Sequence, residues 1–211
     1  MTPTTAQAAS VKRRPAAFLI LHGWENHREP EHWQHWLAYE LLGAGAVVEY
    51  PTLPNPDHPD LSDWMETLQT QLSTLQSHDV TVVCHSLACA LWVTYIDAGL
   101  PCRGVSRVAL VSPPSPRTLR DTEVSAFVEG HTGLASPSGQ SWTVFTSDND
   151  PYCPEGIAAA YDVDDTIELQ LVPTAAHINA ASGYGAWPSI LDWCLDRRVT
   201  AESQAKREVP S

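Results

Sequence analysis

The fold of this chain is decided by the stretch Val80-Thr-Val-Val-Cys-His-Ser-Leu-Ala-Cys89. Its first four residues, 80–83, are β-branched and predict a buried strand, and an apolar helical pattern begins directly after residue 86. The stretch therefore predicts a strand, a very tight turn and a helix. Such a turn leaves the side chain of Ser86 exposed at the strand end, beside the unpaired N–H groups of a helix N-terminus. This arrangement is typical of a nucleophile elbow.

The turn departs from the usual G-x-S-x-G pattern, because Cys84 and Ala88 stand where glycines are common. Both residues are small, so the strand and the helix can still pack closely. The same stretch also fits a second interpretation, in which Ser86 only caps the following helix. Residues elsewhere in the chain have to decide between the two interpretations.

Length and charge limit the classes of protein that this chain can belong to. Its 211 residues suit one domain, and the formal net charge of -13 disfavours binding to nucleic acid or to anionic lipid. No apolar run is long enough to span a membrane, and the N-terminus lacks the apolar segment of a secretory signal. We expect a disordered tail at residues 1–16, with an organelle transit peptide as the weaker alternative. A single domain at 17–196 and a polar tail at 197–211 complete the expected organisation.

The five cysteines, at positions 84, 89, 102, 153 and 194, predict neither a disulfide framework nor a zinc site. Their number is odd and no pair has C-x-x-C spacing. We therefore expect reduced thiols in a cytoplasmic protein, with no metal and no cofactor. His32 and His35 lie three residues apart in an expected helix, but they lack a third ligand at a suggestive spacing.

Strand and helix patterns alternate along the chain. Apolar runs predict strands at 17–21, 46–50, 80–83, 105–111 and 141–146, and an alternating pattern predicts an edge strand with one wet face at 166–171. Helical patterns occur at 30–42, 60–75, 87–98, 154–161 and 186–196, with a weak one at 120–130. This order predicts a doubly wound, mostly parallel α/β sheet of about six strands. Residues 112–116 and the thirty or so residues that follow are the expected cover of a site.

Reactive residue types collect in the loops that follow the expected strands. Ser86 is followed along the chain by an acid at Asp148 or Asp150 and then by His177. A serine hydroxyl needs a base to remove its proton, and a histidine base needs an acceptor that fixes its tautomer. Serine, acid and histidine is the chain order of the α/β-hydrolases, and parallel strands bring their carboxyl ends to one edge. Three such placements together are much more specific than the elbow motif alone.

Several motifs resemble the small bacterial relatives of retinoblastoma-binding protein nine, a family of lidless serine hydrolases. The resemblance covers residues 17–195 and is carried by His22-Gly-Trp24, Tyr50-Pro-Thr-Leu-Pro-Asn-Pro56, Trp64, His85-Ser-Leu87 with Cys89, Ser147-Asp-Asn-Asp-Pro-Tyr-Cys153 and His177-Ile-Asn-Ala-Ala-Ser-Gly-Tyr-Gly-Ala-Trp-Pro188. It implies an α/β-hydrolase fold and a triad of Ser86, Asp150 and His177, since the family's acid directly precedes a proline. Ala88 and Ala176 stand where the family usually has glycine.

An acyl-transfer intermediate also needs two N–H donors for its oxyanion. Leu87, the residue after the nucleophile, offers one at the helix N-terminus, and the resemblance implies that the backbone of Trp24 offers the other. Asp148 fits a turn better than the role of acid, and His85 is expected to pack rather than act as a base. Among the tryptophans, only Trp24 and Trp187 are expected near the pocket.

The function that these residues favour is cleavage of a small carboxyl ester through an acyl-enzyme. An amidase or aminopeptidase could use the same triad, because nothing in the sequence separates esters from amides. A non-catalytic interaction protein of the same fold is a third hypothesis, although every reacting group is present. A nucleotide-binding Rossmann protein is disfavoured, since His22-Gly-Trp24 replaces a glycine-rich phosphate loop.

Overall fold

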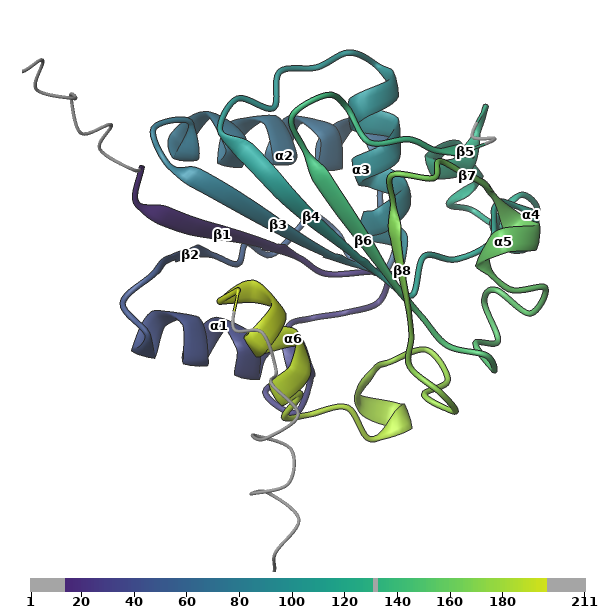
Figure 1. Ribbon diagram of the computed structural model, residues 1–211. Coiled ribbons are helices and arrows are strands. Elements are labelled where there is room, and N and C mark those ends of the chain that lie inside the picture. Colours follow the sequence, from purple (N-terminus) through teal and green to yellow (C-terminus); the bar gives the residue numbers. More distant parts are fainter. Residues whose placement is uncertain (1–13, 131–132, 197–211) are drawn as a thin grey trace, which may run out of the picture.

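A six-stranded parallel sheet forms the centre of the molecule (Figure 1). The computed structural model describes residues 14–130 and 133–196. Residues 1–13 of the tail expected at 1–16, and the whole tail expected at 197–211, lie outside this range. Along the sheet the strands follow the order β2-β1-β3-β4-β6-β8. Their bounds are β1 (Ala16–Leu21), β2 (Val47–Glu49), β3 (Asp79–His85), β4 (Val105–Val111), β6 (Ser141–Thr146) and β8 (Glu168–Leu171).

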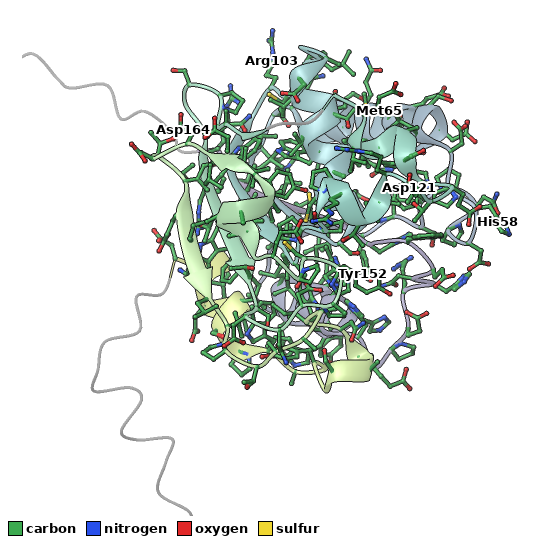
Figure 2. The ribbon with its side chains drawn as sticks, turned by 90° about the vertical axis from the view of Figure 1, so that its right-hand side faces the viewer. His58, Met65, Arg103, Asp121, Tyr152 and Asp164 are labelled. Atoms are coloured by element: carbon green, nitrogen blue, oxygen red, sulfur yellow. The ribbon has the colours of Figure 1, made fainter. Side chains whose placement is uncertain are left out.

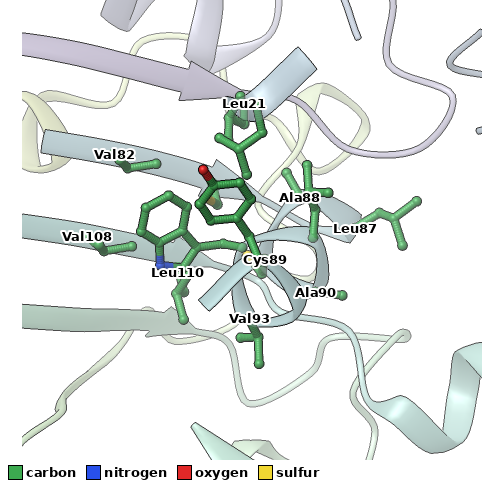
Figure 3. Packing of buried hydrophobic residues seen from close by; sticks show 14 of the residues in the cluster. Leu21, Val82, Leu87, Ala88, Cys89, Ala90, Val93, Val108 and Leu110 are labelled. Atoms are coloured by element: carbon green, nitrogen blue, oxygen red, sulfur yellow. The ribbon is translucent and has the colours of Figure 1, made fainter. Parts of the chain in front are cut away.

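Helices cover both faces of the sheet. Figure 1 shows α2 (Leu61–Leu75) and α3 (Leu87–Asp97) on one face, with α1 (Trp33–Gly43) and α6 (Pro188–Cys194) on the other. Each layer buries its own apolar cluster against the sheet. Figure 3 shows part of the cluster between α3 and the sheet, to which Cys89 of the helix and Val82 and Val108 of the strands belong. This three-layer arrangement confirms the predicted α/β-hydrolase fold class.

The helix ends follow their capping residues. The side chain of Asp60 accepts hydrogen bonds from the backbone N–H groups of Ser62 and Asp63, so α2 begins where the sequence predicts. By contrast, α1 begins at Trp33 rather than Pro30, because the His32 side chain caps it by accepting from the Gln34 N–H. The last helix, α6, is shorter than the helix predicted at 186–196. Strand β1 begins at Ala16, which the sequence analysis placed in the N-terminal tail.

Residues 112–163 contain only short elements. The single helix predicted at 120–130 is wrong, since the chain forms α4 (Pro116–Leu119) and the 3-10 helix η1 (Ser125–Val128) instead. In place of the helix predicted at 154–161, the structure has a single helical turn, α5 (Ile157–Ala160). A two-stranded sheet of β5 (Gly133–Leu134) and β7 (Asp162–Val163) was not predicted, because two-residue strands carry no periodicity.

The last strand, β8, lies at the edge of the sheet as predicted. The face of β8 that was expected to be buried is partly exposed to solvent, because Leu169 is 45% exposed and Leu171 is 59% exposed. In Figure 1 this strand lies on the side of the sheet away from α1 and β2. Across residues 14–130 and 133–196, no helix has the length and apolar character needed to cross a membrane.

Candidate active site

Ser86 occupies a sharp turn between β3 and α3. Its backbone has φ 55 and ψ -124, a left-handed conformation that costs free energy unless the surroundings enforce it. The Ser86 N–H donates to the carbonyl of Val111 at 3.0 Å, and the Ser86 carbonyl accepts from the Cys89 N–H at 2.8 Å. The side chain makes no capping hydrogen bond, so the helix-cap interpretation of Ser86 does not fit this geometry.

The loop after β1 lies directly against Ser86. A Cβ atom at Gly23 would lie 2.7 Å from the Cβ of Ser86, so only glycine fits there without a shift. His22 fixes this loop: its Nε2 accepts from the Leu53 N–H at 2.8 Å, and its Nδ1 therefore donates to the Gly23 carbonyl at 2.9 Å. Burial lowers the pKa of His22, which keeps the ring neutral in this arrangement.

His177 connects Ser86 to an acid. Its Nε2 lies 2.8 Å from the Ser86 Oγ, and its Nδ1 lies 2.9 Å from Oδ2 and 3.0 Å from Oδ1 of Asp150. Asp150 is 3% exposed and His177 is 7% exposed, so water screens their interaction weakly. The Tyr152 N–H donates to Asp150 Oδ1 at 2.9 Å, which fixes the carboxylate further. The three groups form one continuous hydrogen-bonded chain.

The second candidate acid, Asp148, has a different contact. Its Oδ1 accepts from the Thr174 N–H at 2.7 Å. The two residues beside it act in the same way: Ser147 Oγ accepts from the Ala175 N–H at 3.0 Å, and Asn149 Oδ1 accepts from the Ala176 N–H at 2.8 Å. Three consecutive side chains at 147–149 therefore hold three consecutive N–H groups at 174–176.

The segment that carries His177 has an unusual backbone. Thr174, Ala176 and Ile178 all have positive φ values, of 54, 48 and 47. Residues other than glycine pay a steric cost in this region. Glycine, which the resembling family usually has at position 176, adopts such φ values without this cost, whereas Ala176 does not. The hydrogen bonds from residues 147–149 explain how a non-glycine sequence keeps it.

The Ser86 hydroxyl borders a pocket of about 240 Å³. One part of its wall is apolar, with Leu87, Pro114 and Leu119, so the predicted cover that begins at residue 112 does contribute. Another part is polar and carries Glu25, Asn26, Glu29 and Asn179. Asn179 and Ser182 form a reciprocal cap of the 3-10 helix η2 (Ala180–Ser182).

Aromatic residues around the pocket differ from the expectation. Trp24 lines the pocket as predicted, but Trp187 does not; it is buried against Trp33 with ring centres 5.2 Å apart. Tyr152 lies near the middle of the face seen in Figure 2 and is 44% exposed. Its ring centre is 4.4 Å from that of His177, so it covers part of the imidazole.

Comparison with known proteins gives the family. The sequence model of the family described as Serine hydrolase matches residues 18–195. The chain belongs to that family. A curated relative, the YdeN protein of Bacillus subtilis (strain 168), is 33% identical to this serine hydrolase over 78 residues. That alignment covers 37% of this chain and only 40% of the length of YdeN.

Solved structures with the same fold include three that cover most of the serine hydrolase. The ydeN gene product of B. subtilis has a TM-score of 0.67 at 24% identity, covering 86% of this chain and 97% of its own. A YdeN-like protein from Pectobacterium atrosepticum has a TM-score of 0.63 at 24% identity, covering 86% and 90%. A structure from a study of the metagenome-derived lipolytic enzymes LipS and LipT has a TM-score of 0.61 at 14% identity, covering 87% and 94%. These likenesses concern the fold.

The serine hydrolase contains further site contacts that the sequence analysis missed. Trp33, which was considered only as a core residue, donates from its Nε1 to the Ile178 carbonyl at 2.7 Å. Ser147 and Asn149 entered the sequence analysis only as part of the motif at 147–153, and no local pattern links them to residues 175 and 176. In the described part of the serine hydrolase, no group of three or more His, Cys, Asp or Glu side chains could hold a metal. His32 is buried and His35 is exposed.

Proposed function

We propose that this serine hydrolase cleaves small carboxyl esters through an acyl-enzyme, with Ser86 as nucleophile, His177 as general base and Asp150 as its partner. The observation that carries the proposal is the continuous chain of contacts from Ser86 Oγ through His177 to the buried carboxylate of Asp150. Its geometry has the nucleophile, base and orienting acid that acyl transfer requires.

The reaction follows from these positions. Ser86 Oγ attacks the ester carbonyl carbon while His177 Nε2 takes the hydroxyl proton, and Asp150 stabilises the imidazolium through Nδ1–H. The backbone N–H groups of Trp24 and Leu87 receive the oxyanion. Leu87 is the first residue of α3, so its N–H has no partner within the helix. His177 then protonates the leaving alcohol, and water repeats the sequence to release the acid.

The pocket supports a substrate of modest size. Its volume of about 240 Å³ lies below the range of drug-sized ligand sites, and its apolar wall suits a short acyl group. Proteins with the same fold include the lipolytic enzymes above and the enzyme Est1E from Butyrivibrio proteoclasticus. The resemblance to relatives of retinoblastoma-binding protein nine also favours an open site. All five cysteines are unpaired, which supports a cytoplasmic location.

A fluorophosphonate probe tests the nucleophile. The wild-type protein should be labelled, and the Ser86→Ala variant should not be. The same pair is then assayed against esters of increasing acyl length and against matched amides of the same acids. We expect Ser86-dependent turnover of short esters in preference to amides. Equal labelling of both proteins would reject Ser86 as nucleophile, and faster amide turnover would reassign the enzyme as an amidase.

A further inference from the structure

We propose that His85, backed by His32, is a positioning residue that holds His177 in place through the His177 backbone carbonyl. The inference rests on the proposed function, because it concerns the base of that reaction. His85 directly precedes the nucleophile, yet the mechanism above gives its side chain no task. His85 lines the pocket, and the hydrogen bond from its ring goes to the His177 backbone rather than to Ser86, so we assign it a positioning role.

The direct contact is between a side chain and the backbone. Nε2 of His85 lies 3.0 Å from the His177 carbonyl oxygen, and the two ring centres are 5.1 Å apart. A carbonyl oxygen can only accept, so His85 Nε2 carries the proton and donates. Burial lowers the pKa of His85 well below its ordinary value and keeps the ring neutral. A neutral neighbour does not repel the positive charge that His177 gains during the reaction.

His32 supports the other side of the His85 ring. The His32 Nδ1 accepts from the Gln34 N–H at 3.2 Å, so in the neutral ring Nε2 carries the proton. Burial lowers the pKa of His32 to about 4, which makes the neutral form the dominant one at pH 7. The rings of His32 and His85 meet edge to face with centres 5.0 Å apart.

The remaining ring nitrogens of this pair complement each other. Nε2 of His32 and Nδ1 of His85 are both buried, and neither hydrogen-bonds to any residue in the described ranges. The first is a donor and the second is an acceptor, by the tautomers just derived. Buried polar atoms rarely stay unpaired, so these two nitrogens are natural partners for each other. In the structure, however, His32 supports His85 through the edge-to-face ring contact alone.

The hydrogen bond from His85 to the His177 carbonyl lies in a strained segment of the backbone. The positive φ values of Ala176 and Ile178 flank His177, so the segment is strained on both sides of the base. Residues 147–149 hold its N–H groups from one side, while His85 and Trp33 hold the carbonyls of residues 177 and 178 from the other. Without the His85 donor, the His177 carbonyl loses its side-chain partner and the imidazole can move away from Ser86.

The test compares His85→Gln, which keeps a donor at a similar reach, with His85→Leu, which has none, and with His85→Asn, which is too short. Thr81→Val, a buried change earlier in the same strand, is the control and should leave ester turnover unchanged. For the Leu and Asn variants we expect kcat to fall on the order of 100-fold with KM nearly constant, and His85→Gln to recover most of it. Equal losses in folded Gln and Asn variants, or full activity in the Asn variant, would overturn the proposal.

A second readout does not depend on turnover. The Nδ1 proton that His177 shares with Asp150 should give a far-downfield proton NMR signal in the wild type. It should persist in His85→Gln and broaden or vanish in His85→Asn, because the imidazole is then no longer held. If the wild type hydrolyses no ester, the proposed function fails, and this signal alone decides the positioning role. Its persistence in all variants would refute that role.

Discussion

The two halves of the candidate site are held in different ways. The nucleophile half, Ser86 with its strand and helix, is fixed by backbone hydrogen bonds and by close packing against Gly23. The base half, residues 147–150 and 174–178, contains no regular element and is fixed by side chains that hydrogen-bond to backbone groups. We therefore expect the activity to be sensitive to side-chain volume in the nucleophile half and to the loss of individual polar atoms in the base half.

The largest expected effect separates the two acids of the base half. Asp150→Asn keeps the shape but loses the carboxylate that orients His177, so kcat should fall by about 10⁴-fold. Asp148→Asn keeps an oxygen that can accept from the Thr174 N–H, so its loss should be far smaller. Steady-state kinetics on folded proteins decides the assignment. Comparable losses for the two variants would mean that Asp150 is not the partner of His177.

A second prediction concerns His32, which caps α1 and packs against His85, and its effect on stability at low pH. The folded-state pKa of His32 is about 4, below its ordinary value of 6.5, so the unfolded chain binds more protons between these values. Stability should therefore fall as the pH drops from 6.5 to 4, by up to about 3 kcal/mol from this residue.

The measurement is denaturant unfolding of the wild type and of His32→Asn, whose side chain can still cap α1. A comparison at pH 8, where both proteins carry a neutral side chain there, gives the packing difference. The variant should lose less stability than the wild type between pH 8 and pH 4. Parallel curves for the two proteins would contradict the assignment of a neutral buried His32.

A third prediction tests volume in the nucleophile half. Gly23→Ala places a Cβ 2.7 Å from the Cβ of Ser86, so either Ser86 or the loop after β1 must shift. We expect kcat to fall on the order of 100-fold. Gly43→Ala is the matched control, since a Cβ at this last residue of α1 would meet nothing within 4 Å. Ester kinetics should separate the two variants. Full activity in Gly23→Ala would show that the elbow is looser than its contacts imply.

The smallest expected effect concerns one acceptor in the base half. Asn149→Ala removes the oxygen that holds the Ala176 N–H, while Ser147, Asp148 and His85 still hold the segment. We expect kcat to fall by roughly tenfold, which corresponds to the net contribution of one hydrogen bond of about 1.4 kcal/mol. Asn149→Asp keeps an acceptor oxygen and should restore most of the rate. If both variants match the wild type, single polar atoms matter less in this half than proposed.

The same contrast explains what the sequence could predict. The elbow is a local pattern, since a β-branched run, a small residue and a helical period lie within ten residues, and β3 and α3 follow it closely. The order of serine, acid and histidine along the chain predicted His177 but left Asp148 and Asp150 open, and only the family resemblance favoured Asp150. The structure brings Asp150 and His177 into contact. The contact of Trp33 with Ile178 spans 145 residues and leaves no trace in any window of sequence. Similarly, β5 and β7 are too short to show a period, and their pairing depends on tertiary structure.

The contact between Trp33 and Ile178 joins residues 145 positions apart, so the site can be complete only after most of the chain has been synthesised. The elbow strand lies near the middle of the chain, so Ser86 emerges from a ribosome long before His177. Contacts between residues distant in sequence form late because loop closure must come first. An incomplete chain therefore carries a serine without its base, and hydrolysis should begin only when the last strand and its following loop dock. Recovery of ester turnover after refolding would then report completion of folding rather than collapse.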